Sequence, residues 1–438
     1  TAKEALVEIR DPVHGSIHIS EEIAPIIRHP FFQRLRNIKQ LGLTEYIFPG
    51  ATHTRFIHSI GVMHIGSKVF DKLFAQNLNN PDIKKLRETF KLGCLLHDIG
   101  HAPLSHSTES VMPTLAELKI PKEFLDDVDL KGERQATHED YTIKSIADSS
   151  FSESFKDVEA KYGVLRSCIA DVIRGSTHND KYFTVDGINW FPILHQLVSS
   201  ELDCDRMDYL LRDSYFCGVS YGSYDLDWLI DNLEPCFIDG KAVLGISERA
   251  VVTFDDFLLS RYHMFVMVYF HYRAVCLEQL LLRYFQTSDE YRIPADIEEY
   301  QEHDDHYLMK FLRKSSNKYA KSIVLNEIPK KVFESFNQPQ LETLEQIQNY
   351  LQEQNIEFIR CSSKGRLSKY YQNELIDKSF SLRVVRKTFS GDTTFTNIDA
   401  ATDLYKKFST SHAVNRLHFN LKDLSKDQLN HVQELIKE

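Results

Sequence analysis

Apolar positions along the chain recur mostly at three- and four-residue spacing, which is typical of helices with one buried face. One such stretch carries an apolar helix to His97 and Asp98, and Gly100 and Pro103 then end it. Further helices are expected over residues 30–41, 53–78, 201–213 and 248–285, and one more begins with Thr137 as its N-cap. The pattern therefore predicts a mainly α fold.

Strand-like alternation is short and local. Val7-Glu8-Ile9 precedes a turn at residues 11–15, and Asp239-Gly240 separates two short apolar runs, which is a β-hairpin signal. Beyond residue 288, a polar helical segment is followed by strand-like runs at 356–360, 380–385 and 416–420. We therefore expect a helical core over residues 1–288 with a small β-hairpin, and a C-terminal helical and α+β lobe over residues 289–438.

Composition narrows the class of protein. The chain has 438 residues and a net charge of −11, which disfavours a polyanion as the main partner. Its seven cysteines are scattered and lack a CxxC spacing, which fits a reduced cytoplasmic compartment. No signal peptide is visible, and the apolar runs are too short to span a membrane. Residues 360–387 hold eight Lys or Arg and two acids, so nucleic-acid or anion binding there stays an alternative to the commoner solvated surface.

The first candidate site surrounds the adjacent His97-Asp98 pair, which His101 and His106 follow closely. Imidazole and carboxylate are the ligands that Zn, Mn, Fe or Mg prefer. A lone histidine on an apolar helix is more often a hydrogen-bonded core residue, and an adjacent His-Asp pair can also be a cap with a salt bridge. A metal site is favoured over these two alternatives only if other segments of the chain supply further ligands.

Two other helices offer such ligands. His58 lies three residues after Arg55, so the two side chains share a helix face. On the helix over residues 201–213, five residues with three carboxylates and one aromatic among them fall within an arc of roughly 140°; they are Asp205, Asp208, Tyr209, Arg212 and Asp213. Surface ion-pair helices use Glu and Lys more often than Asp, which is a poor helix former, so this arc favours metal or sugar binding.

The candidate metal ligands are His58, His97, Asp98 and Asp205. Two imidazoles and two carboxylates leave coordination positions open for water and a phosphate oxygen, as in catalytic sites. Phosphoryl chemistry also needs positive charge on the non-bridging oxygens, for which Arg55 and Arg206 are candidates. It needs an acid for the leaving oxygen, for which His106 and His138 are candidates, with Glu109 placed to orient an imidazole.

The ordered set His58, His97-Asp98 and Asp205 resembles the signature of the HD superfamily of metal-dependent phosphohydrolases. Longer motifs are similar to the deoxynucleoside triphosphate (dNTP) triphosphohydrolases, which include bacterial members and the catalytic core of the vertebrate SAM-and-HD-domain protein. These motifs are Asp11-Pro12-Val13-His14-Gly15, Phe32-Gln33-Arg34-Leu35-Arg36, Lys39-Gln40-Leu41-Gly42, the segments 53–59 and 97–106, and Asp205-Arg206-Met207-Asp208-Tyr209. The similarity covers residues 7–285 and fades in the C-terminal lobe.

The resemblance implies hydrolysis of a dNTP to a deoxynucleoside and inorganic triphosphate, with water attacking the α-phosphorus and a divalent metal (Mn, Mg, Fe or Zn) held by the four ligands. It implies that His106 protonates the departing 5′ oxygen in a relay with His138 and Glu109. The residues implied to contact the phosphates, the sugar or the pocket are Gln40, Arg55, His101, Arg206, Tyr209, Asp213, Arg261, Tyr269 and His271.

The resemblance also implies a nucleotide effector and a homo-oligomer, either a dimer or a tetramer. Gln33 and Arg36 match part of the effector site, whereas Arg28 stands where guanine-activated members carry an acidic residue. Three alternatives follow for this site: it binds an effector with a different base, it binds an inhibitor, or it is vestigial and binds no effector.

Two alternative functions stay open. An HD-type nucleotidase or phosphodiesterase acting on another phosphoester would release phosphate or pyrophosphate rather than triphosphate. A nucleotide-sensing scaffold without catalysis would keep its anion binding after loss of His97 and Asp98. The presence of all four metal ligands together with both proton carriers favours the dNTP triphosphohydrolase.

Overall fold

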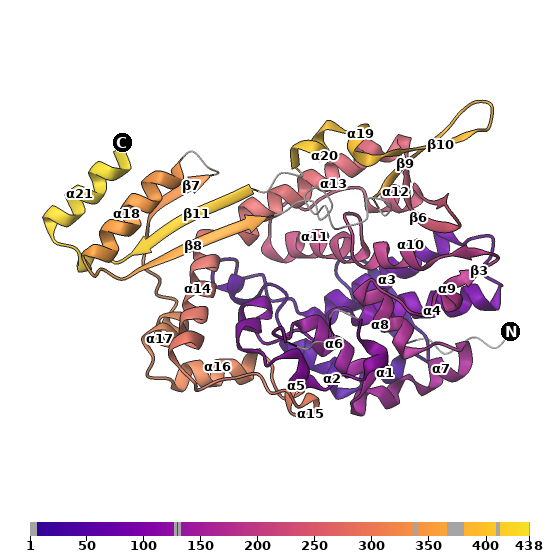
Figure 1. Cartoon of the computed structure of the whole chain (residues 1–438), viewed down its shortest axis with the longest axis horizontal. Coiled ribbons are helices and arrows are strands. Elements are labelled where there is room, and N and C mark those ends of the chain that lie inside the picture. Colours follow the sequence, from indigo (N-terminus) through magenta and orange to yellow (C-terminus); the bar gives the residue numbers. More distant parts are fainter. Residues whose placement is uncertain are drawn as a thin grey trace.

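The computed structural model describes residues 7–126, 129, 133–336, 340–365, 381–408 and 412–437. Helices dominate it (Figure 1), which confirms the predicted mainly α class. The α-helices are α1 (Ala24–Arg28), α2 (Pro30–Gln33), α3 (Arg55–Leu73), α4 (Pro81–Leu96), α5 (Leu115–Leu118), α6 (His138–Ala147), α7 (Lys156–Tyr162), α8 (Arg166–Arg174), α9 (Asp180–Phe183), α10 (Phe191–Val198), α11 (Cys204–Cys217), α12 (Leu226–Asp231), α13 (Val251–Met264), α14 (Tyr272–Thr287), α15 (Ile297–Tyr300), α16 (Asp305–Lys314), α17 (Lys318–Leu325), α18 (Leu341–Glu353), α19 (Ile398–Ala401), α20 (Asp403–Phe408) and α21 (Lys426–Lys437).

Within the described ranges, the strands form three small sheets. They are β1 (Val7–Asp11), β2 (Gly15–Ile19), β3 (Thr184–Val185), β4 (Ile188–Asn189), β5 (Leu233–Ile238), β6 (Lys241–Ser247), β7 (Lys330–Phe336), β8 (Phe358–Gly365), β9 (Arg383–Lys387), β10 (Thr393–Asn397) and β11 (His412–Phe419). Strands β1 and β2 pair as a hairpin, a mixed sheet has the order β10-β9-β6-β4-β3 with β5 on β6, and an antiparallel sheet has the order β7-β11-β8. The predicted hairpin at Asp239-Gly240 is the β5–β6 turn, where both residues have positive φ.

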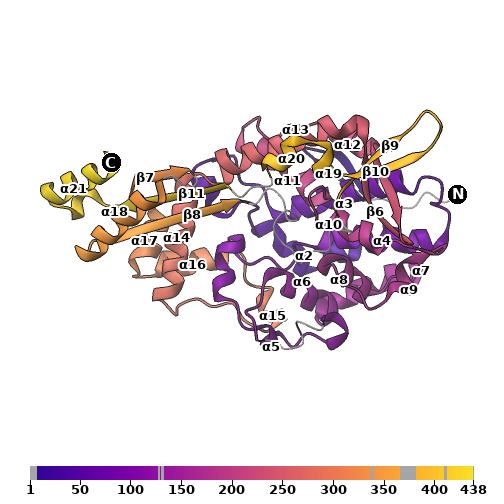
Figure 2. The same ribbon diagram turned by 45° about the horizontal axis from the view of Figure 1, so that its top comes forward.

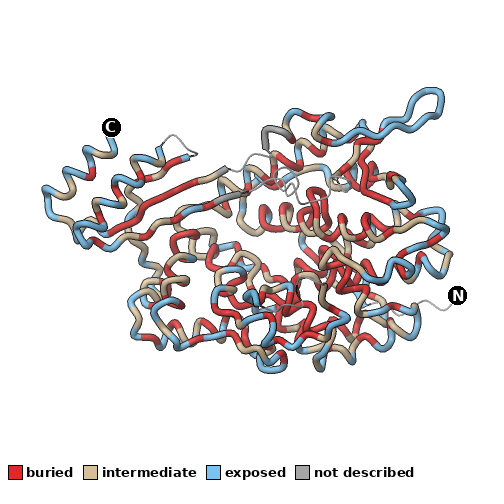
Figure 3. The backbone as a smooth tube through the Cα atoms, viewed as in Figure 1, coloured by how far each residue is buried: buried red, intermediate tan, exposed pale blue. Residues whose placement is uncertain are grey.

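The third sheet projects from the helical body. In both ribbon views, β7, β8 and β11 with α18 and α21 extend from one end, on the side away from the N-terminus (Figures 1 and 2). Buried segments run through the central helices and along β11, while the outer helices expose one face (Figure 3). A continuous apolar cluster reaches from the first helices through α14, α16 and α17 to Ile359 and Cys361 of β8. The predicted boundary at residue 288 therefore falls within a shared core.

The helices that carry the candidate site begin and pack as their sequences dictate. Asn80 caps α4, the Asp203 carboxylate accepts the Arg206 N–H at the start of α11, and Thr137 and Asp140 form the predicted capping box of α6. Helices α3 and α11 approach closely at Gly61, where a Cβ atom would lie 2.1 Å from an Asp208 carboxylate oxygen. The missing side chain thus lets the two helices bring their polar residues together.

Several predicted elements differ in the structure. The expected helix over residues 248–285 is wrong in its continuity, because a π-helical segment, Phe265–Tyr269, separates α13 from α14 and the two halves meet at 62°. The helix that begins at Pro30 is shorter than expected, since it passes into a 3-10 turn over Arg34–Asn37. Strand β7 lies within a region expected to be helical. Residues 366–380 of the basic window lie outside the described residues.

Among the described residues, no single helix is both long and apolar enough to cross a bilayer. The two segments Glu248–Tyr269 and Tyr272–Thr287, which meet at a bend, reach the length and hydropathy of a membrane span only when they are taken together.

Candidate functional site

The four predicted metal ligands come together from three helices. His58 lies on α3, His97 and Asp98 directly follow α4, and Asp205 lies in the first turn of α11. The His58 Nε2 atom is 3.0 Å from Asp205 Oδ1 and 3.6 Å from Asp98 Oδ2, while His97 Nε2 is 3.5 Å from Asp98 Oδ1 and 3.6 Å from Asp205 Oδ1. Two imidazoles and two carboxylates thus converge on one point.

The orientation of the imidazoles fits a metal. His58 Nδ1 bonds Asp208 Oδ2 at 2.7 Å, and His97 Nδ1 bonds the Cys94 carbonyl at 2.8 Å. A protonated Nδ1 in each ring leaves the Nε2 lone pair for a ligand. Both Nε2 atoms are buried and form no hydrogen bond in the structure. Buried polar atoms that lack partners, aimed at one point between carboxylates, are what a divalent cation requires.

The electrostatics of the site also favour a cation. Burial opposes protonation of His58 and His97, but the neighbouring aspartates outweigh it and raise the pKa of His58 to about 9 and that of His97 to about 10. Burial likewise opposes ionisation of Asp98, yet Arg55, His97 and His101 hold its pKa well below its usual range. The carboxylates are therefore ionised and attract positive charge, which protons on the two imidazoles supply without a metal and a divalent cation would supply in their place.

Behind His58 lies a fully buried ionic layer. Asp208 accepts hydrogen bonds from His58, from His14 at 2.6 Å and from both Nε and Nη2 of Arg212 at 2.8 Å, and Arg212 also bonds Asp11 at 2.8 Å. Arg212 and Asp208 have no exposed side-chain surface. This layer fixes the His58 ring and joins the N-terminal hairpin to α11. The sequence motifs contain these residues, but their spacing gave no sign of this role.

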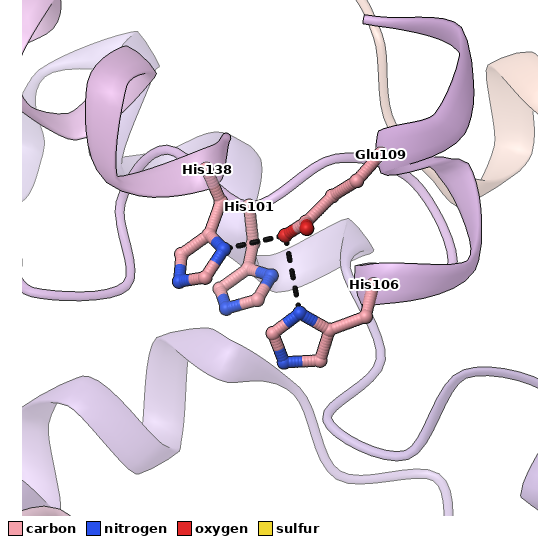
Figure 4. Close-up of side chains that lie close together, drawn as sticks. All are labelled: His101, His106, Glu109 and His138. Atoms are coloured by element: carbon pink, nitrogen blue, oxygen red, sulfur yellow. Dashed lines mark hydrogen bonds and ion pairs between the residues drawn. The ribbon is translucent and has the colours of Figure 1, made fainter. Parts of the chain in front are cut away.

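A second titratable cluster lies beside the first (Figure 4). His106 Nδ1 is 3.1 Å and His138 Nδ1 is 2.5 Å from the same oxygen of Glu109. The His138 ring stacks on that of His101 with centroids 3.9 Å apart, and His101 Nε2 lies 3.2 Å from Asp98 Oδ1. Figure 4 shows each of the two imidazoles with one nitrogen toward Glu109 and the other turned away. His106, His138 and Glu109 thus form one cluster, which contacts the proposed metal ligand Asp98 through His101.

Burial opposes ionisation of Glu109, but hydrogen bonds from His106 and His138 outweigh it and lower its pKa well below the usual range. The carboxylate therefore accepts the Nδ1 protons, and each ring keeps Nε2 for exchange with a ligand. The environment of His101 has the opposite effect, since burial, the charge of Arg55 and the stacked His138 lower its pKa well below the usual range. His101 is accordingly neutral and donates Nε2–H to Asp98.

A cavity of about 400 Å³ opens onto both clusters, and a second of about 410 Å³ adjoins it, sharing Gln40, Arg55 and His106. Residues lining the first cavity are Gln40, Arg55, His97, Asp98, His101, His106, His138, Glu139, Ile173, Val198, Ser199, Asp205 and Tyr209. The predicted contacts Gln40, Arg55, His101 and Tyr209 are among them. Arg55 forms an ion pair with Asp98 and donates to Ser105 Oγ at 2.9 Å.

Two further predicted contacts lie at the edge of this space. Tyr269, from the π-helical segment, lines the second cavity and donates its hydroxyl proton to Asp213 at 2.7 Å. Asp213 in turn is 2.7 Å from Nε2 of His53, whose ring stacks on Phe216. Asp213 is therefore tied into a buried His–Asp–Tyr chain, in which His53 is the member that the sequence analysis did not single out.

The remaining predicted residues lie elsewhere among the described residues. Arg206 forms an ion pair with Asp203, and Arg261 Nη1 lies 3.4 Å from Glu201. His271 caps α14 and makes an edge contact with Phe48. In the part of the chain that the structure describes, neither cavity is lined by Arg206, Arg261 or His271.

The proposed effector residues bond to each other on the surface. Arg36 Nε donates to Gln33 Oε1 at 2.7 Å, and its guanidinium lies 3.6 Å from the Phe56 ring centroid. Gln33 also donates to the Ile27 carbonyl at 2.7 Å. Both side chains are thus held beside α3, which carries Arg55 and His58.

The loop between the two clusters is held by residues that sequence reasoning missed. Leu104 and Ser105 have φ of 55° and 61°, a left-handed conformation that ordinary side chains rarely adopt. Asp305, at the start of α16, accepts the backbone N–H groups of Leu104 at 2.8 Å and Lys39 at 2.9 Å. The Tyr300 hydroxyl donates to the Gly100 carbonyl at 2.7 Å. No local signal marks these residues, because their partners lie about 200 positions away.

Family comparison agrees with this geometry. A family model of the HD domain matches residues 55–160, which contain both candidate clusters apart from Asp205, and a model of an HD-associated region matches residues 224–357. The chain is an HD-domain protein. It is related to the dNTP triphosphohydrolases of that superfamily, as the resemblance predicted.

Three similar proteins illustrate the relationship. An uncharacterized protein of Methanocaldococcus jannaschii is 30% identical over 352 residues, 77% of this chain and 65% of that protein. Deoxynucleoside triphosphate triphosphohydrolase SAMHD1 of Homo sapiens is 26% identical over 294 residues, 65% of this chain and 45% of that protein. The solved structure of a hypothetical protein from Aquifex aeolicus has a TM-score of 0.71 at 25% identity and covers 99% of this chain and 100% of that one. The chain spans 45–65% of the length of these two curated relatives.

Proposed function

We propose that this HD-domain protein hydrolyses dNTPs to deoxynucleoside and inorganic triphosphate, with water attacking the α-phosphorus. The observation that carries the proposal is the pairing of two clusters on one cavity: a four-ligand cation site and, beside it, two imidazoles oriented by one carboxylate. A site that only bound nucleotides would need no more than the cation site. A hydrolase needs, in addition, a proton donor that is oriented beside the cation.

The proposed cation site consists of His58, His97, Asp98 and Asp205. A divalent ion bound there (Mn, Mg, Fe or Zn) would neutralise phosphate charge and lower the pKa of an attacking water. The chain itself would orient the triphosphate through Arg55 and His101, which line the cavity beside Asp98. Arg206 and Arg261 are proposed phosphate contacts that would act only after side-chain movement from Asp203 and Glu201.

The proposed general acid is His106. Glu109 accepts its Nδ1 proton, so Nε2 is the nitrogen that would deliver a proton to the departing 5′ oxygen. His138 shares the same carboxylate oxygen and would replace that proton. Gln40, Tyr209 and Asp213 are the proposed contacts of the sugar, and Tyr269, held by Asp213, would pack against C2′ and disfavour a ribose. His271 would act at the pocket only indirectly, by capping α14.

The decisive experiment identifies the product. The purified chain is incubated with each dNTP and with Mn, Mg, Fe or Zn in turn, and the products are resolved by ion-exchange chromatography. Triphosphate together with deoxynucleoside is the expected result. Phosphate or pyrophosphate would instead support an HD-type nucleotidase or phosphodiesterase. Nucleotide binding without turnover, retained after His97→Ala, would support a sensing scaffold.

Regulation and assembly are further parts of the proposal. The same incubation with a second nucleotide tests an effector site at Gln33 and Arg36, which lie on the surface beside α3. Activation or inhibition that is lost in Arg36→Ala is expected if the site is functional. Sedimentation of the chain with and without nucleotide tests the proposed homo-oligomer.

A further inference from the structure

A buried group of two thiols and one imidazole lies outside both cavities of the proposed catalytic site. Cys276 is on α14, Cys361 on β8 and His418 on β11, and each has 0% exposed surface. Their sulfur and nitrogen atoms all lie within 4.8 Å of one another. The group sits where the C-terminal sheet meets α14, a junction visible in Figure 1.

The sheet register explains how two of these residues meet. Strands β8 and β11 pair antiparallel, with Cys361 opposite Arg416 and Ile359 opposite His418. Residues two apart on a strand share a face, so His418 is a diagonal neighbour of Cys361 on the same face of the sheet. Helix α14 packs against β8 and contributes Cys276 from the third side. Three elements thus supply one ligand-type atom each.

His418 carries the orientation expected of a metal ligand. Its Nδ1 donates to the backbone carbonyl of Pro329 at 3.2 Å, which leaves the Nε2 lone pair without a proton. That Nε2 atom is buried and has no hydrogen-bond partner in the structure. An imidazole fixed through Nδ1, with an unpartnered Nε2 facing two thiols, needs a further group between them.

We propose that Cys276, Cys361 and His418 bind a zinc ion that fastens the C-terminal sheet to α14. Thiolate and imidazole select a thiophilic cation over Mg or Mn. Zinc–sulfur bonds of about 2.3 Å and zinc–nitrogen bonds of about 2.0 Å place ligand atoms roughly 3.5–3.8 Å apart. Because the three atoms lie within 4.8 Å of one another, a contraction of at most about 1.3 Å would close the site. Binding would release both thiol protons to solvent, and a water molecule would complete the coordination.

A zinc ion at this site would also act on the cavity region, because Glu278, Gln279 and Leu282 on the same helix as Cys276 line the second cavity. The zinc site does not depend on the proposed hydrolase activity, and its test uses no activity measurement.

Cobalt substitution tests the site directly. The whole chain is reduced, stripped of metal with a chelator and titrated with Co²⁺, and the near-ultraviolet sulfur-to-cobalt charge-transfer band is recorded. The proposed HD ligands contain no sulfur, so cobalt bound there does not give this band, and the cysteine variants show which thiols do. We expect one thiolate-bound cobalt per chain in the wild type and in Asp205→Asn, displaced by one equivalent of Zn²⁺. Cys361→Ser should lose the band, whereas Cys236→Ser, a buried cysteine on β5, should keep it.

A second measurement, made on the wild type, tests the site even if Cys361→Ser does not fold. In the native wild type, one equivalent of zinc should protect Cys276 and Cys361 from alkylation, as mapped by mass spectrometry, and leave the other cysteines unchanged. Absence of the charge-transfer band at saturating cobalt, the same band in Cys361→Ser, or a disulfide between Cys276 and Cys361 in place of metal would each overturn the proposal.

Discussion

The two clusters on the cavity differ in how the fold supports them. The proposed metal ligands lie in the first turns of α3 and α11 and directly after α4, and His58 has no exposed side-chain surface. The proposed proton carriers lie on a 3-10 turn and the first turn of α6, and the His106 side chain is 67% exposed. A cation site needs fixed distances, whereas a proton donor must meet both substrate and solvent. The site therefore has a rigid half, which consists of the proposed metal ligands, and an accessible half, which consists of the proposed proton carriers.

The largest expected effect comes from breaking the rigid half. Asp205→Asn removes a charged ligand, so metal content should fall to background and turnover by at least about 1000-fold, equivalent to several kcal/mol of transition-state stabilisation. Metal analysis and triphosphate release measure the two effects. Asp227→Asn, on a side chain that is 79% exposed, is the matched control and should retain both. Full turnover in Asp205→Asn would contradict the assigned metal site.

Breaking the accessible half should affect turnover and leave the metal in place. We expect His106→Ala to lower kcat by at least about 100-fold, because a general acid contributes a factor of that order, with unchanged metal content. The exposed His306, on α16, provides the control His306→Ala. The deficit should shrink for p-nitrophenyl triphosphate, whose leaving group needs no proton. An equal deficit with both substrates would remove His106 from the acid role.

The ionic layer behind His58 tests whether rigidity itself matters. Asp208→Asn keeps every metal ligand but disrupts bonds to His58, His14 and Arg212. We expect metal affinity to fall by about 10- to 100-fold. The free energy of unfolding should fall by about 3–5 kcal/mol, since Arg212 remains buried with an incomplete set of partners. Metal titration and chemical denaturation give the two values, with Asp231→Asn at the end of α12 as control.

The smallest effect concerns the loop that joins the two halves. Burial raises the pKa of Asp305 to about 6, above its ordinary 3.8. The folded chain therefore binds more protons than the unfolded chain between these values, so this contribution to stability is full below pH 3.8 and is lost as pH rises through about 6. Asp305→Asn removes this dependence.

We accordingly expect the stability of Asp305→Asn, relative to the wild type, to improve as pH rises from about 4 to about 6 in chemical denaturation. Turnover should fall by less than about tenfold, because the loop loses the equivalent of one hydrogen bond. A stability difference that stays constant with pH would show that Asp305 does not titrate in this range.

The sequence determined local features of this protein: the helix start at Thr137, the hairpin at Asp239-Gly240 and the residue types of the four proposed metal ligands. Capping and turn chemistry act over a few residues, so they can be recognised without a fold. The HD signature likewise records residue types at fixed spacing.

Only the tertiary structure decided which of the other predicted residues face the cavity. Arg206 and Arg261 turn toward Asp203 and Glu201, the helix beyond residue 264 bends through a π-helical segment, and Asp305 supports a loop about 200 positions earlier in the chain. These outcomes depend on packing between distant segments, where burial and partner geometry compete with helical periodicity. Periodicity fixes the face on which a side chain lies but not the partner that it meets there.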